Sequence, residues 1–103
     1  MTTSKQKAAG SEAERYVARL FGGRRVYGYG PVDVIADGWL DLQVKAVHLP
    51  PSLNAVRRYL ENMPKGRHLR GVVVIERPGA AFRARRTITF DLDEFSEWYG
   101  HDV

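Results

Sequence analysis

The feature that most constrains the fold is a short apolar run, residues 71–76 (GVVVIE), with the length and β-branched content of a strand buried on both faces. Residues 39–47 alternate like a second strand, and the apolar residues of 53–63 are spaced as on a helix. A helical crossover of this kind joins parallel strands, because antiparallel neighbours need only a tight turn. The sequence therefore predicts an α/β domain with a central mixed sheet flanked by helices.

The remaining segments predict further elements around this unit. Ser11 reads as the N-cap of a first helix that ends at Gly22-Gly23, and Pro50-Pro51-Ser52 opens the second helix. With 103 residues the chain has room for one domain, residues 1–103, of which the basic start is expected to be flexible. The expected ranges are a flexible segment 1–9, helices 11–21, 53–63 and 92–99, and strands 25–29, 32–36, 39–47, 71–76 and 87–90.

Composition restricts the chemistry that the chain can perform. It has no cysteine, which excludes disulfides, thiolate zinc sites and cysteine nucleophiles, and its three histidines lack metal-ligand spacing. No apolar run approaches the roughly 20 residues of a membrane span, and the first ten residues lack the apolar core of a secretory signal. We therefore expect a cytoplasmic protein without a membrane partner, whose chemistry rests on oxygen groups, lysine and arginine.

Positive charge is concentrated between residues 57 and 86, which hold nine Lys and Arg against two acids. From Asp91 onward the sign reverses, with five acids and no Lys or Arg. Such a distribution favours contact with nucleic-acid phosphates, although a solvated basic surface is the competing interpretation. The residues expected to contact DNA are Arg57, Arg58, Lys65, Arg67, Arg70, Arg83, Arg85 and Arg86.

Polar residues interrupt the apolar pattern at Asp33 and along residues 41–45, and the hairpin register decides whether they meet. A two-residue Asp37-Gly38 turn would put Asp33 on the face opposite Gln43 and Lys45. A three-residue turn, residues 36–38, instead pairs Asp33 with Asp41 and requires a positive φ at Gly38.

The three-residue turn separates the two faces of the hairpin cleanly, so we favour it. One face then carries Val32, Val34, Leu40, Leu42, Val44 and Ala46, and the other carries Asp33, Ile35, Trp39, Asp41, Gln43 and Lys45. A solvent-exposed polar face is the alternative interpretation, against which the apolar Ile35 and Trp39 argue.

Glu14 is a further polar exception, because helical spacing places it at the edge of the buried face of the first helix. Taken alone, Ser11-x-x-Glu14 is better explained as a capping box. If the helix packs near the polar face of the hairpin, Glu14 instead joins Asp33, Gln43 and Lys45. Carboxylate and amide oxygens suit Mg²⁺, and the lysine would stabilise charge on a phosphate or help position or deprotonate a water.

Three motifs in this order resemble the PD-(D/E)XK nucleases, and within them the archaeal-type Holliday junction resolvases: Gly10-Ser11-x-Ala13-Glu14-Arg15, Val32-Asp33-Val34-Ile35-Ala36 and Gln43-Val44-Lys45. The resemblance implies a restriction-endonuclease-like core and a hydrolytic site formed by Glu14, Asp33, Gln43 and Lys45. It implies Mg²⁺, or Mn²⁺ in its place, on Glu14, Asp33 and Gln43, and a homodimer that holds branched DNA such as four-way junctions.

Gln43 departs from the family pattern, since the family usually has an acid at this position. The amide keeps an oxygen and removes a charge, and Asp41, opposite Asp33 in the favoured register, is a candidate substitute ligand. Two functions therefore stay open: a metal-dependent endonuclease of the Holliday junction resolvase kind, and a nuclease-fold DNA-binding module with weak or lost catalysis. An RNA-binding domain ranks last, because the chain lacks the exposed aromatic motif of single-strand readers.

Overall fold

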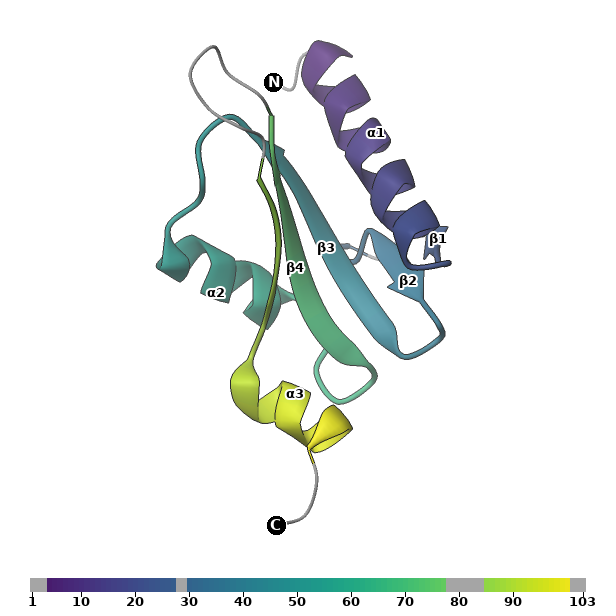
Figure 1. The fold of residues 1–103 in the computed structure, drawn as a ribbon, viewed down its shortest axis with the longest axis vertical. Coiled ribbons are helices and arrows are strands. Elements are labelled where there is room, and N and C mark those ends of the chain that lie inside the picture. Colours follow the sequence, from purple (N-terminus) through teal and green to yellow (C-terminus); the bar gives the residue numbers. More distant parts are fainter. Residues whose placement is uncertain (1–3, 28–29, 78–84, 101–103) are drawn as a thin grey trace.

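In the described part of the chain, five strands lie in one mixed sheet in the order in which they occur along the sequence, and three helices accompany them (Figure 1). The computed structural model describes residues 4–27, 30–77 and 85–100. An α/β domain with a mixed sheet is therefore confirmed. The elements are α1 (Ser4–Leu20), β1 (Arg24–Arg25), β2 (Val34–Ala36), β3 (Leu40–Val47), α2 (Leu53–Asn62), β4 (Leu69–Glu76), β5 (Arg86–Phe90) and α3 (Leu92–Tyr99).

The predicted crossover unit is confirmed, because β3 and β4 pair in parallel and α2 connects them. The Ser52 hydroxyl accepts a hydrogen bond from the Ala55 N–H at 3.1 Å, as expected of an N-cap. Along the helix, Val56 and Leu60 are buried, whereas Leu53 at its start is exposed.

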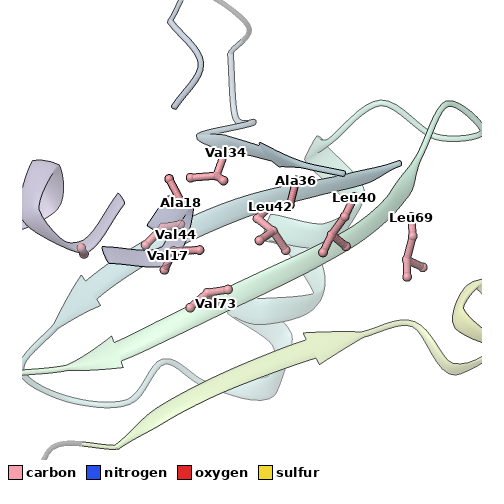
Figure 2. Close-up of a cluster of buried hydrophobic side chains, with 10 residues drawn as sticks. Val17, Ala18, Val34, Ala36, Leu40, Leu42, Val44, Leu69 and Val73 are labelled. Atoms are coloured by element: carbon pink, nitrogen blue, oxygen red, sulfur yellow. The ribbon is translucent and has the colours of Figure 1, made fainter. Parts of the chain in front are cut away.

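Side chains alternate between two apolar clusters on opposite faces of the sheet. On one face, Leu42 and Val44 of β3 pack with Val17 of α1 (Figure 2). On the other face, Val72 and Val74 of β4 pack with residues of α2. Because both faces of β3 and β4 are covered, Gln43 on the α2 side is buried, and Lys45 further along the strand is partly buried.

The hairpin register differs from the predicted one. Asp41 pairs with Ile35, and Ala36 pairs with Leu40, so the turn consists of residues 37–39. Gly38 has a positive φ, as predicted. Asp37 also has a positive φ, which was not predicted. The shift is by two residues, and the side-chain period of a strand is two, so Gln43 and Lys45 keep their predicted face.

Two residues outside the paired strands depart from the predicted faces. Val32 packs in the cluster on the α2 side, and Trp39 packs against the cluster on the α1 side. Val32 precedes β2 and Trp39 lies in the turn, where strand alternation no longer dictates the direction of a side chain.

The first helix begins earlier than predicted. α1 starts at Ser4, so Ser11 lies inside the helix and cannot form a capping box with Glu14. The backbone of residues 4–9 is helical, and residues 1–3 lie outside the described part. The helix ends as expected before Gly22, whose φ of 63° is typical of a left-handed helix end.

Candidate active site

Asp33 directly precedes β2 and lies where β3 extends beyond its pairing with β2. Pairing between β2 and β3 ends at Leu42, whereas β3 continues to Val47. The Asp33 N–H bonds to the Leu42 carbonyl at 2.9 Å, and Asp33 Oδ2 accepts from the Val44 N–H at 2.8 Å. The carboxylate thus replaces the missing strand partner and is fixed against the edge of β3.

Burial is the main cause that raises the pKa of Asp33 above its ordinary value. The bond from Val44 and the charges of Lys45 and Arg25 oppose this effect. A cation placed against a half-buried carboxylate of this kind would stabilise its charged form.

The charge of Asp33 acts on Glu14, although α1 covers the opposite face of the sheet from Gln43. Burial and then the charge of Asp33 raise the pKa of Glu14, while Arg25 lowers it. Glu14 and Asp33 are therefore near enough to repel each other. That Glu14 belongs to the active site stays a prediction.

Arg25, which the sequence reasoning missed, is the main ionic partner of Glu14. Its Nη2 lies 3.5 Å from Glu14 Oε2 and 3.4 Å from Ser11 Oγ, and its guanidinium lies 5.1 Å from the centre of the Tyr27 ring. Its charge also acts on Asp33. The sequence indicated its position only indirectly, because Arg25 begins an expected strand next to the predicted hairpin.

Gln43 and Lys45 lie on the α2 side of β3, two residues apart on the same face. Gln43 is only 6% exposed, and its Oε1 is buried without a hydrogen-bond partner. Lys45 Nζ lies 4.6 Å from the centre of the Tyr59 ring of α2, a cation–π contact that holds the ammonium in place. The aromatic partner on α2 was not predicted.

The donor set fits a magnesium ion. A buried amide oxygen without a partner is costly, and it is a ligand that Mg²⁺ accepts together with carboxylates and water. The neighbouring carboxylates of Asp33 and Glu14 repel each other, which a divalent cation would relieve. In residues 4–27, 30–77 and 85–100 no group of three or more His, Asp or Glu is arranged to hold a metal.

Asp41 belongs to a different network from the one suggested. It is fully buried, and its Oδ1 lies 2.8 Å from His68 Nδ1 and 3.5 Å from Arg67 Nη2. Because Asp41 faces Ile35 rather than Asp33, it does not replace the acid missing at Gln43.

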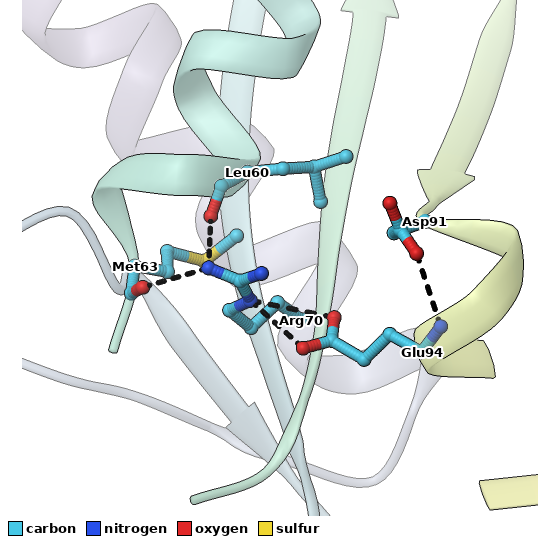
Figure 3. A network of polar contacts seen from close by, with 5 residues as sticks. All are labelled: Leu60, Met63, Arg70, Asp91 and Glu94. Carbon is cyan, nitrogen blue, oxygen red and sulfur yellow. Dashed lines mark hydrogen bonds and ion pairs between the residues drawn. The ribbon is translucent and has the colours of Figure 1, made fainter. Parts of the chain in front are cut away.

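Arg70 was expected to contact DNA, but its side chain is held within the protein (Figure 3). It is 8% exposed, and its Nη1 donates to the carbonyls of Leu60 and Met63 at 2.9 and 3.0 Å. Its Nε lies 3.0 Å from Glu94 Oε1. Arg70 therefore joins the end of α2 to α3 and cannot reach a phosphate without breaking these contacts.

The other cations expected to bind DNA lie on three segments. Arg57 and Arg58 are exposed on α2, and Lys65 and Arg67 are exposed between α2 and β4. Arg85 precedes β5 and Arg86 begins it, both exposed. Arg83 lies outside the described residues.

Comparison of the chain with protein-family models, with curated proteins and with solved structures finds no match. None of the helices in the described ranges is long and apolar enough to cross a membrane.

Proposed function

We propose that this chain is a metal-dependent endonuclease with a restriction-endonuclease-like core that hydrolyses phosphodiesters in branched DNA, with the four-way Holliday junction as its first substrate. The observation that carries the proposal is the Asp33 carboxylate, which interacts electrostatically with both Glu14 and Lys45, together with the unpartnered oxygen of Gln43 on the face of β3 that carries Lys45. Carboxylates whose pKa values are raised at a strand edge, with a lysine in electrostatic range, are typical of catalytic sites.

Glu14, Asp33 and Gln43 would hold Mg²⁺, or Mn²⁺ in its place. When bound, the ion supplies charge stabilisation at the phosphate and makes a water more acidic. The Val44 N–H fixes one oxygen of Asp33 and so orients the carboxylate. A ligand held in this way needs little reorganisation when phosphate arrives.

Lys45 is the group best placed to act on the substrate. Its ammonium lies within electrostatic range of Asp33 and is held by the Tyr59 ring. From there it would stabilise negative charge on the phosphate or orient the attacking water. Lys45 cannot bind the metal itself.

Arg25 is a positioning residue in this proposal. It holds Glu14 by an ion pair and partly offsets the repulsion between Glu14 and Asp33. In the absence of metal this cation stabilises a pair of carboxylates that would otherwise weaken the fold.

Exposed cations on α2 and on the segment before β4, with Arg85 and Arg86, would supply phosphate contacts and little base readout. A four-way junction has two-fold symmetry, and one domain of this size offers little surface to hold it, so the proposal includes a homodimer.

The test is a cleavage assay on four-way, flap, nicked and linear DNA with Mg²⁺, Mn²⁺ or EDTA. The proposal expects metal-dependent cleavage that is fastest on the four-way junction. A DNA-binding module without catalysis would bind the junction and leave it intact at every metal concentration. Cleavage in EDTA at the rate seen with Mg²⁺ would contradict metal dependence.

A further inference from the structure

The sheet ends at β5 with a strand edge that has no neighbour among the described strands. β5 is hydrogen-bonded to β4 alone and is the outermost arrow in Figure 2. Thr87 and Ile88 are exposed. Proteins usually protect such an edge with a proline, a bulge or a central charge, and the middle of this strand, residues 87–89, has neither proline nor charge. The edge is therefore suited to accept another strand.

The free hydrogen-bonding groups belong to alternate residues of β5. The Glu76 N–H donates to the Arg85 carbonyl at 2.8 Å, which fixes the hydrogen-bonded positions in the β4–β5 ladder. Because these positions alternate, the two threonines bond towards β4. The N–H and C=O groups of Arg86, Ile88 and Phe90 consequently face away from β4.

A second copy of the same strand matches these groups. In an antiparallel pair with its two-fold axis at Ile88, this residue lies opposite Ile88 of the second copy, and Arg86 lies opposite Phe90 of the second copy. All the outward-facing residues then exchange both backbone hydrogen bonds with their partners. The Arg86 guanidinium keeps its contact with the Tyr16 ring of its own copy, 5.0 Å from the ring centre.

The charges around β5 favour the same arrangement. Arg85 and Arg86 stand at the start of the strand, and Asp91 and Asp93 follow its end. Antiparallel pairing about Ile88 places Arg85 opposite Asp91 of the second copy, and symmetry repeats the contact. A parallel arrangement would instead bring the arginines of both copies together, which costs free energy.

We propose that two copies of this chain join through their β5 edges, antiparallel about Ile88, to form one continuous sheet. The inference rests on the homodimer of the proposed function and names its interface. The pairing moves Arg85 from the phosphate contacts to the dimer interface. Glu14, Asp33 and Gln43 lie on α1, beside β2 and on β3, so both candidate active sites stay outside the interface.

Disulfide trapping tests the register, since the chain has no cysteine of its own. In the proposed pair Thr87 faces Thr89 of the second copy at a position that is not hydrogen-bonded, with Cα atoms about 4.5 Å apart. Thr87 lies about 8 Å from Thr87 of the second copy, because the two are staggered by two residues. Only the first distance allows a disulfide.

Thr87→Cys and Thr89→Cys should therefore form disulfide dimers when mixed and oxidised, and far fewer when each is oxidised alone. Each single variant is the matched control for the other. Equal cross-linking in the single variants and the mixture, or none in the mixture, would overturn the proposed register.

Light scattering on the unmodified protein provides a second measurement. The wild type should be a dimer at micromolar concentration, and Ile88→Lys, which places two like charges on the axis, should raise the dissociation constant at least about tenfold. A wild type that stays monomeric, or an Ile88→Lys variant that dimerises equally well, would reject the interface. Neither experiment uses DNA or metal. Cleavage by a protein that does not form this dimer would therefore reject only the interface. Formation of this dimer by a protein that does not cleave DNA would reject only the proposed function.

Discussion

Arg70 provides the most quantitative test of the structure, because its side chain was expected to contact DNA and instead connects α2 to α3 (Figure 3). Replacing it with Met keeps an unbranched apolar stem and removes the guanidinium. The carbonyls of Leu60 and Met63 then lose a donor, and the Glu94 carboxylate, only 11% exposed at its side chain, loses its cation.

Removing one partner of a buried ion pair costs about 3 to 5 kcal/mol, because the remaining charge is left without compensation. A domain of this size has roughly 5 to 15 kcal/mol of total stability. At a slope near 2 kcal/mol per molar urea, Arg70→Met should therefore lower the unfolding midpoint by roughly 2 M. Glu94→Gln is the matched control and should cost about 1 to 2 kcal/mol, since Arg70 keeps its carbonyl acceptors.

The assay is urea unfolding followed by circular dichroism, together with junction binding measured where each variant is folded. We expect Arg70→Met to bind DNA within about twofold of wild type, a change of less than 0.5 kcal/mol. A stability loss below about 1 kcal/mol, combined with a clear loss of DNA affinity, would refute the reasoning and return Arg70 to the phosphate contacts.

Four further outcomes are expected. Gly10→Ala should raise the free energy of unfolding by about 0.5 to 1 kcal/mol in thermal or urea melts, because Gly10 lies inside α1 with open space around its Cα; a loss of stability would mean that the helix does not extend to this residue. Burial raises the pKa of Asp33, so wild type should lose stability as pH rises from about 4 through the raised pKa. In urea melts with EDTA, Asp33→Asn should lack this loss and be the more stable protein at neutral pH, whereas added Mg²⁺ should stabilise wild type alone. Gln43→Glu should lower the Mg²⁺ concentration at half-maximal cleavage, and an unchanged midpoint would remove Gln43 from the ligand set. Charge reversal at Arg57 and Arg58 should weaken binding to every DNA sequence alike and reduce the salt dependence of the affinity, and unchanged binding would make this face of α2 a solvated surface.

The crossover unit was predictable because its signals are local and agree with one another. Alternating apolar and polar residues mark β3, an apolar run marks β4, and Ser52 caps the helix between them. The face shared by Gln43 and Lys45 was also predictable, because it depends on the parity of the register. The exact register depends on whether Asp37 adopts positive φ, which sequence pattern does not determine for a residue other than glycine.

The start of α1 and the roles of individual charges could not be predicted in the same way. Gly10-Ser11 has the composition of a helix start, and the structure continues the helix through it. A count of charges does not distinguish Arg70 from Arg57. In the structure Arg70 is buried against two carbonyls, whereas Arg57 is exposed. Likewise, Arg25 and Tyr59 reach the site only through tertiary packing.

The central claim is that hydrolysis takes place at the carboxylate that Val44 fixes against the edge of β3. The most direct test compares junction cleavage and junction binding by wild type and Asp33→Ala over a range of Mg²⁺ and Mn²⁺ concentrations. We predict that wild type cleaves the four-way junction, and that Asp33→Ala binds it with similar affinity and leaves it intact. Cleavage that survives Asp33→Ala would show that the chemistry lies elsewhere, and a wild type inert at every metal concentration would show that the chain is not a nuclease.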